Sequence, residues 1–244
     1  MPTPSRPRSL ADLLIVFGPC FTAPTFRTFC ALVMGFLAQP GRRTVTGMLV
    51  GARLAGRWHH TRAPVLAAAR WSPDALGLLL VGLIATRVLD RQAPLHLVVD
   101  DTLVRRSDRK VWVPAGTMTR WHAGASRSPW GKSWVVLRVL VRLPFLPQRA
   151  VCLPVLARLW RPHQPGRSKL DLACALVALV PERDLDRRIH PVCDAAYAGR
   201  TLRELPTRVI VTTRLRADAA LYQLSPPHTG RPDRPRAKAT GCPS

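Results

Sequence analysis

The sequence is short of acidic residues: 14 aspartates and glutamates stand against 37 lysines and arginines, giving a formal net charge of +23 over 244 residues. Such a charge attracts polyanions, namely DNA, RNA or an anionic membrane surface. Lysine is also scarce, and occurs only at positions 110, 132, 169 and 238. The excess of arginine, alanine and proline is typical of GC-rich codon usage, but codon usage does not explain the shortage of acids. The charge therefore favours nucleic acid as the partner.

Metal-binding and disulfide patterns are missing. No two cysteines have a CxxC or other metal-ligand spacing, which argues against a structural zinc site. His122 and the pair His59–His60 are isolated, so they build neither a zinc site nor a nucleophilic triad. Several cysteines lie inside apolar runs, where a reduced thiol acts as a small hydrophobe, and this usage predicts a reducing cytoplasm. The six cysteines are at positions 20, 30, 152, 174, 193 and 242.

Apolar runs long enough to cross a membrane are absent too. The strongest, at 75–86, is ended by Arg87 well short of the ~20 residues that a spanning helix needs. Pro19, Pro24 and Arg27 interrupt the apolar N-terminal stretch, so it does not read as a signal peptide. We expect core helices and no membrane partner. A basic membrane-associated protein that uses the 75–89 segment is the weakest alternative.

Two short apolar runs that end on aspartates carry the most information. LHLVVDDT occupies 95–102, and RIHPVCDAAYAG occupies 188–199. Neighbouring parallel strands place their carboxyl ends together, where α/β proteins bind ligands. Carboxylate oxygens at that edge are ligands that Mg²⁺ prefers. The pattern therefore predicts a magnesium site that acts on nucleic acid.

The hydrophobic period changes along the chain. From about 10 to 90 it is helical, and Ser72-Pro73-Asp74 is a strong helix start. Gly41-Arg42-Arg43, between two apolar helices, permits a helix-turn-helix arrangement. Beyond 95 the pattern predicts strands at 95–101, 110–116, 132–144, 149–160, 189–194 and 208–216, with helices at 169–180 and 199–206.

This order predicts an α/β fold: a ribonuclease-H-like mixed sheet with flanking helices, incomplete, preceded by a helical N-terminal region. We divide the chain into a disordered tail (1–9), a helical region that is a candidate for DNA binding (10–92), a truncated catalytic core (93–222) and a disordered basic tail (223–244).

Several local signatures run through the chain. They are PGRRTVTGML at 40–49, ARWSPDALG at 69–77, LVVDDTLVRRSDRKV at 97–111, GKSWVVL at 131–137 and VCDAAYAG at 192–199. From Phe26 to Gln223, the chain resembles a DDE-type insertion-sequence transposase of the DDE endonuclease superfamily found in bacteria. The DDT and CDAAYAG blocks are the most specific of these signatures.

The resemblance implies three carboxylates that hold two divalent ions, Mg²⁺ or Mn²⁺, for phosphoryl displacement at transposon ends. It matches Asp101 to the first catalytic aspartate and Asp194 to the second. Asp100 is the rival for the first position, because adjacent strand residues point to opposite faces; we prefer Asp101, which we place at the strand mouth. A purely structural alternative is that Asp100 caps a turn and that Asp194 caps a helix starting near Tyr197 or Gly199.

The third carboxylate of the family, a glutamate on a later helix, has no counterpart. Glu182 precedes Asp194, Glu204 follows it too closely, and Asp218 and Asp233 fall in or near the tail. We therefore expect a transposase truncated at its C-terminus, or frameshifted, with little or no strand-transfer activity alone.

Basic residues near the first aspartate are candidates for DNA contact. Arg is suited to bidentate phosphate binding, and Trp134, with Trp121 and Trp130 nearby, either stacks on a strand or packs in the core, which we favour. The expected partner is double-stranded DNA at transposon ends, bound by a homodimer. The alternative is a catalytically inactive DNA-binding remnant. The candidate DNA-binding residues are Arg105, Arg106, Arg109, Lys110 and Lys132.

Overall fold

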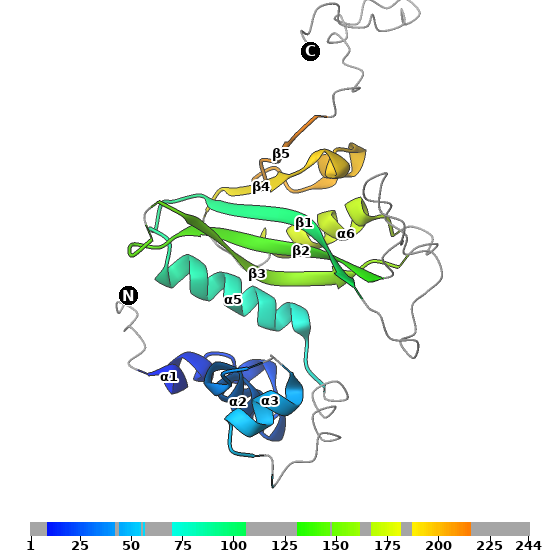
Figure 1. Ribbon diagram of the computed structural model, residues 1–244. Coiled ribbons are helices and arrows are strands. Elements are labelled where there is room, and N and C mark those ends of the chain that lie inside the picture. The colour runs from blue at the N-terminus through cyan, green and yellow to red at the C-terminus, as the bar shows by residue number, and fades with distance from the viewer. Residues whose placement is uncertain are drawn as a thin grey trace, which may run out of the picture.

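A five-stranded mixed sheet forms the centre of the computed structural model, which describes residues 9–41, 44–54, 56, 70–105, 131–146, 148–161, 167–181 and 187–215. The strand order is β3-β2-β1-β4-β5 (Figure 1). β2 runs antiparallel to β1 and β3, whereas β4 runs parallel to β1 and β5. This topology confirms the predicted ribonuclease-H-like sheet. The strands are β1 (Leu95–Arg105), β2 (Gly131–Arg142), β3 (Ala150–Leu159), β4 (Ile189–Cys193) and β5 (Thr212–Thr213).

The N-terminal region is helical, as predicted, with α1 (Leu10–Ile15), α2 (Ala23–Ala38) and α3 (Val45–Gly51). The backbones of α2 and α3 touch at Gly35, where an added Cβ would lie 1.8 Å from the carbonyl oxygen of Met48. Thr44 caps α3, accepting a hydrogen bond from the Gly47 amide at 3.0 Å. The arginines of the predicted helix-turn-helix connector, at 42 and 43, lie outside the described residues. None of the helices described here is long and apolar enough to cross a membrane.

Helix α5 (Pro73–Arg87) starts where the sequence predicts and runs alongside β3 (Figure 1). Ser72 caps it through the Ala75 amide at 3.2 Å. Asp74, in its first turn, accepts two hydrogen bonds from Arg158 of β3, at 2.7 and 2.6 Å. A cavity of about 680 Å³ lies between the start of α5 and strands β2 and β3.

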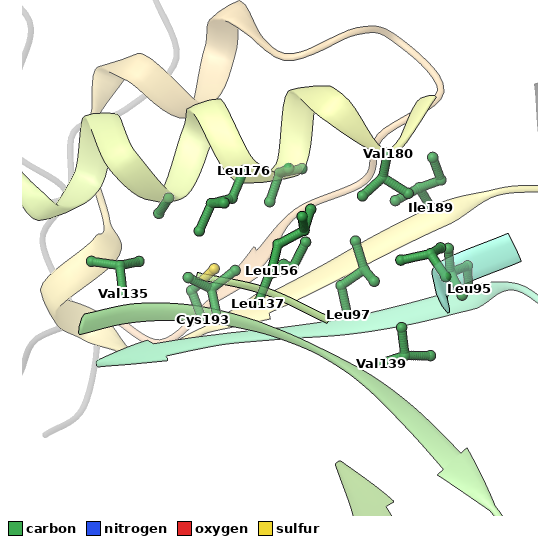
Figure 2. Packing of buried hydrophobic residues seen from close by; sticks show 14 of the residues in the cluster. Leu95, Leu97, Val135, Leu137, Val139, Leu156, Leu176, Val180, Ile189 and Cys193 are labelled. Carbon is green, nitrogen blue, oxygen red and sulfur yellow. The ribbon is translucent and has the colours of Figure 1, made fainter. Parts of the chain in front are cut away.

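Helix α6 (Lys169–Leu179) packs over one face of the sheet and closes the main core (Figure 2). Alternate residues of β1 point toward it, and Leu95, Leu97 and Val99 are all buried. From α6, Leu176 and Val177 fill the space above them. Burial on one face and partial exposure on the other fixes the register of β1.

The last part of the sheet is less regular than predicted. The expected strand at 208–216 is reduced to β5 and one bridge between Ile189 and Val209. The expected helix at 199–206 is a 3₁₀ helix, Arg200–Glu204. Between β2 and β3 the register shifts after Leu137, so that Arg138 lies opposite Pro154. The predicted strand at 110–116 lies outside the described residues.

Candidate functional site

The two candidate aspartate positions lie where β1 and β4 separate. Their parallel pairing ends at Val99 and Cys193, and Asp100 and Asp194 are the next residues of the two strands. β1 itself does not end there, because it continues to Arg105 in antiparallel pairing with β2. The prediction that β1 ends at its aspartates was therefore wrong. The two strands nevertheless bring these carboxylates to one edge of their shared ladder.

Asp101 lies on the α6 face of β1. Side chains alternate along a strand, so residues 97, 99 and 101 point to the same side. The Asp101 side chain is 29% exposed. The Ser133 hydroxyl, from β2, donates to Asp101 Oδ2 at 3.2 Å. The ammonium group of Lys169, the first residue of α6, forms an ion pair with the same oxygen. The carboxylate is therefore already neutralised by a cation of the chain.

Asp100 points to the opposite face of the sheet. Its side chain is 57% exposed, and Arg138 of β2 approaches its Oδ2 only to 3.9 Å. Its Oδ1 accepts a hydrogen bond from the amide of Asp101 at 2.8 Å. The alternative that Asp100 caps a turn is wrong, because this residue lies inside the strand. The two adjacent aspartates thus face different surroundings.

Asp194 is exposed just beyond β4. Its Oδ1 accepts a hydrogen bond from the Ala196 amide at 2.6 Å, so it caps the 3₁₀ helix Ala195–Tyr197. The helix-capping alternative is therefore confirmed, with the helix starting earlier than expected. The Asp194 carbonyl also accepts a hydrogen bond from the Thr213 hydroxyl at 3.0 Å, which ties this turn to β5.

Tyr197 is a member of this site that the sequence analysis missed. The residue is 1% exposed, and its hydroxyl has no hydrogen-bond partner among the described residues. Burial raises its pKa well above the usual range, and the charges of Asp101, Asp100 and Asp194 raise the pKa further, in that order. All three carboxylates therefore act on one buried phenol.

Cys193, the last residue of β4, is part of the same buried layer. Burial raises the pKa of its thiol to about 11, with Cys174 of α6 and Asp194 adding to the effect. The thiol is therefore protonated and unreactive at neutral pH.

The carboxylates suit a magnesium ion in the kind of atom they offer but not in number. Oxygen ligands are what Mg²⁺ prefers. Within the described ranges, however, no three acidic, histidine or cysteine side chains form a group that could hold a metal. Glu204 is exposed on its 3₁₀ helix, and the other candidates for the third carboxylate, at 182, 218 and 233, lie outside those ranges. No catalytic step through a metal follows from this arrangement.

Most of the predicted DNA contacts fall outside the described residues, namely those at 106, 109 and 110, and Trp121 and Trp130 fall there too. Arg105 is the last residue of β1, and Lys132 of β2 lies opposite Val104. Trp134 lines the cavity beside α5 together with Trp71, so it is not part of the buried core.

Comparison with known protein families identifies a family to which the chain is similar. The sequence profile of a family described as DDE superfamily endonuclease matches residues 16–243, nearly the whole chain. Endonucleases of this superfamily generally use divalent metal ions and act on DNA. A search of curated proteins finds no match.

Proposed function

We propose, from the premise that the chain belongs to the DDE superfamily of endonucleases, that it is a transposase for Mg²⁺-dependent cleavage and strand transfer of DNA at insertion-sequence ends. The observation that supports the proposal is that the parallel pairing of β1 and β4 ends at Val99 and Cys193, so that Asp100 and Asp101 on β1 and Asp194 beyond β4 all follow the last pair. Divalent ions in such enzymes activate the attacking oxygen and stabilise the leaving one. Asp101 and Asp194 are the residues that would hold them.

The electrostatics of the chain support DNA as the substrate. A net charge of +23 draws a polyanion to the protein, and neutralising phosphates releases counterions. We therefore expect affinity for duplex DNA to fall steeply as the salt concentration rises. We propose a homodimer on paired ends as the working form.

A second candidate is a DNA-binding protein without catalysis. Two observations favour it: the ion pair that neutralises Asp101, and the absence of a three-ligand group from the part of the chain that the structure describes. Such a protein would occupy transposon ends and compete with a complete transposase.

One experiment separates the two candidates. Binding of a labelled duplex and nicking of a supercoiled plasmid are measured with Mg²⁺, with Mn²⁺ and with EDTA, for the wild type, Asp101→Asn and Asp194→Asn. The matched control is Asp90→Asn, which changes an exposed carboxylate just before the same strand. A transposase nicks only with metal, and both site variants lose turnover while the control keeps it.

Nicking that survives both substitutions would refute the proposal. DNA binding that is equal in EDTA and in all variants, without nicking, would establish the second candidate. We expect strand transfer by this polypeptide alone to be weak, because Asp101, the proposed first metal ligand, is bound to Lys169.

A further inference from the structure

The most exposed large apolar side chain of the described residues lies in the turn between β2 and β3. Phe145 is 76% exposed, and its neighbour Leu146 is 41% exposed. The turn is tight, because the Leu143 carbonyl accepts a hydrogen bond from the Leu146 amide at 2.9 Å. Pro144 occupies the second position of this turn, where its fixed φ is favoured. The backbone therefore holds Phe145 at the corner of the turn, in solvent.

Packing of the described residues does not account for this apolar pair. Leu143, at the start of the turn, packs against the main core and anchors the hairpin. Phe145 and Leu146 are not among the described residues that make up or contact that core. Neighbouring apolar side chains that stay exposed, with polar residues around them, are typical of an interaction site.

Arginines surround the turn. Arg142 is the last residue of β2 and Arg149 directly precedes β3, and both are exposed. Arg188 is exposed as well, and its carbonyl accepts a hydrogen bond from the first amide of β1 at 2.9 Å. Asp90 and Arg91, in the connector before β1, add one charge of each sign. This end of the sheet is therefore positive around an apolar turn.

The turn and the predicted DNA contact Arg105 lie at opposite ends of the sheet (Figure 1). Leu97, near the start of β1, pairs with Val139, near the end of β2, so the turn after β2 lies beside the start of β1. Arg105 is the last of the 11 residues of β1. At 3.3 Å per residue these span about 36 Å, close to the length of one turn of B-DNA. A duplex that lies along β1 therefore presents the same groove to both ends.

We propose that the β2–β3 turn is a second DNA contact, in which Arg142 and Arg149 bind phosphates and Phe145 is inserted as a wedge between two base pairs from the minor groove. Apolar wedges unstack a base step and bend the duplex, and the added contacts offset the cost. Arginine is suited to the flanking phosphates because it binds them bidentately. The inference rests on the proposed function in taking DNA as the ligand, but it needs neither a metal nor the aspartates.

The test measures untwisting of DNA, which an inserted wedge causes and a surface contact does not. A closed plasmid is relaxed by a metal-independent topoisomerase, in EDTA, with the protein bound, and its linking number is read after the protein is removed. The wild type should leave the plasmid underwound. Phe145→Ala should leave it relaxed and should bind a short duplex about tenfold more weakly, a loss typical of an aromatic side chain that stacks on a base.

Two matched variants make the comparison specific. Ile210→Ala truncates another exposed apolar side chain, 54% exposed and just before β5, and should change neither readout. Phe145→Met keeps an apolar wedge and should retain most of the untwisting. Equal untwisting by the wild type and Phe145→Ala, or an equal loss in Ile210→Ala, would overturn the proposal.

The arginines are tested through the salt dependence of duplex binding. Arg142→Gln/Arg149→Gln should lower the slope of log affinity against log salt concentration by about two, one for each lost phosphate contact. Arg142→Lys/Arg149→Lys keeps both charges and should keep the slope. A slope that the glutamine variant leaves unchanged would exclude these arginines from the interface and overturn their part of the proposal.

An anionic membrane is the other surface that an apolar turn flanked by arginines can bind. We favour DNA, because endonucleases of this superfamily act on DNA. Phosphatidylserine vesicles are the second probe, and we expect their binding to be the same in the wild type and Phe145→Ala. If Phe145→Ala loses vesicle binding and keeps its affinity for the duplex, the turn is a membrane contact and the proposal is wrong.

The outcomes also separate this inference from the proposed function. If the wild type nicks DNA with metal while Phe145→Ala binds and untwists DNA equally well, the wedge is wrong and the transposase proposal stands. If Phe145→Ala loses untwisting but no variant nicks DNA, the wedge stands and the DNA-binding candidate is supported. If the wild type binds no duplex, both proposals fail.

Discussion

The two faces of β1 differ most where two aspartates follow each other in the sequence. On the α6 face, Asp101 is mostly covered and holds a lysine and a serine hydroxyl. On the opposite face, Asp100 is mostly exposed and has one distant arginine. Identical side chains one residue apart thus receive different chemistry from the alternation of the strand alone. The face covered by α6 is therefore where both the stability and the candidate chemistry of this strand should be concentrated.

The largest difference should come from core truncation on the two faces. Leu176→Ala removes a fully buried side chain of α6 and should lower the free energy of unfolding by about 2–5 kcal/mol. Val192→Ala changes a residue of β4 that is 38% exposed on the other face, and should cost less than about 1 kcal/mol. Urea unfolding measures both, and equal losses would remove the distinction between the faces.

Exchange of each aspartate tests the same contrast at the site. Asp101→Asn leaves the largely covered Lys169 without its counter-charge and should lower the free energy of unfolding by about 1–3 kcal/mol. Asp100→Asn removes only an exposed, distant pair and should change it by less than about 0.5 kcal/mol. Thermal unfolding at neutral pH distinguishes the two variants. A larger loss for Asp100→Asn would show that Asp100, and not Asp101, is the aspartate whose ion pair stabilises the fold.

The pH dependence of the free energy of unfolding should report on the buried thiol of Cys193. The pKa of Cys193 is raised in the folded protein to about 11 from its ordinary 9.0. A raised pKa means that the folded state retains the proton longer, so its stabilising effect is complete below about pH 9 and is lost as the pH rises toward 11. Unfolding titrations across this window should show falling stability, with a smaller slope in Cys193→Ala. An unchanged slope would contradict the burial of this thiol.

Thiol labelling is the mildest comparison, since it leaves the fold unaltered. Cys152 of β3 is exposed, whereas Cys174 of α6 and Cys193 of β4 are buried. At neutral pH a thiol reagent should label Cys152 rapidly and the two buried cysteines only as the protein opens. Mass spectrometry of quenched samples gives the order. Early labelling of Cys193 would show that α6 does not close this face.

Local signals in the sequence predicted the helices well. Ser72-Pro73-Asp74 gave the start of α5, because an N-cap and a first-turn proline act within a few residues. The extent of β1 was predicted wrongly, because its last residues are held by β2, which follows only after position 130. Periodicity along one segment carries no information about such a partner.

The candidate site was predicted in part. The sequence indicated that the segments carrying Asp101 and Asp194 form neighbouring strands, but not that Lys169, 68 positions beyond Asp101, would bind Asp101. One signal was present: a basic residue begins a helix where an acidic one is favoured. Tyr197 was missed because nothing in the sequence marks a hydroxyl that will be buried and have its pKa raised by the charges of three carboxylates.

The two outer strands of the described sheet, β3 and β5, bear on association between chains. An exposed strand edge offers unpaired amides and carbonyls that can recruit another chain into an aggregate. At one border β3 carries Pro154, which lacks an amide hydrogen, beside a break in register. At the other border β5 is only two residues long. Neither border gives a foreign strand a long, regular ladder, so the described sheet has little tendency to recruit a second chain by strand addition.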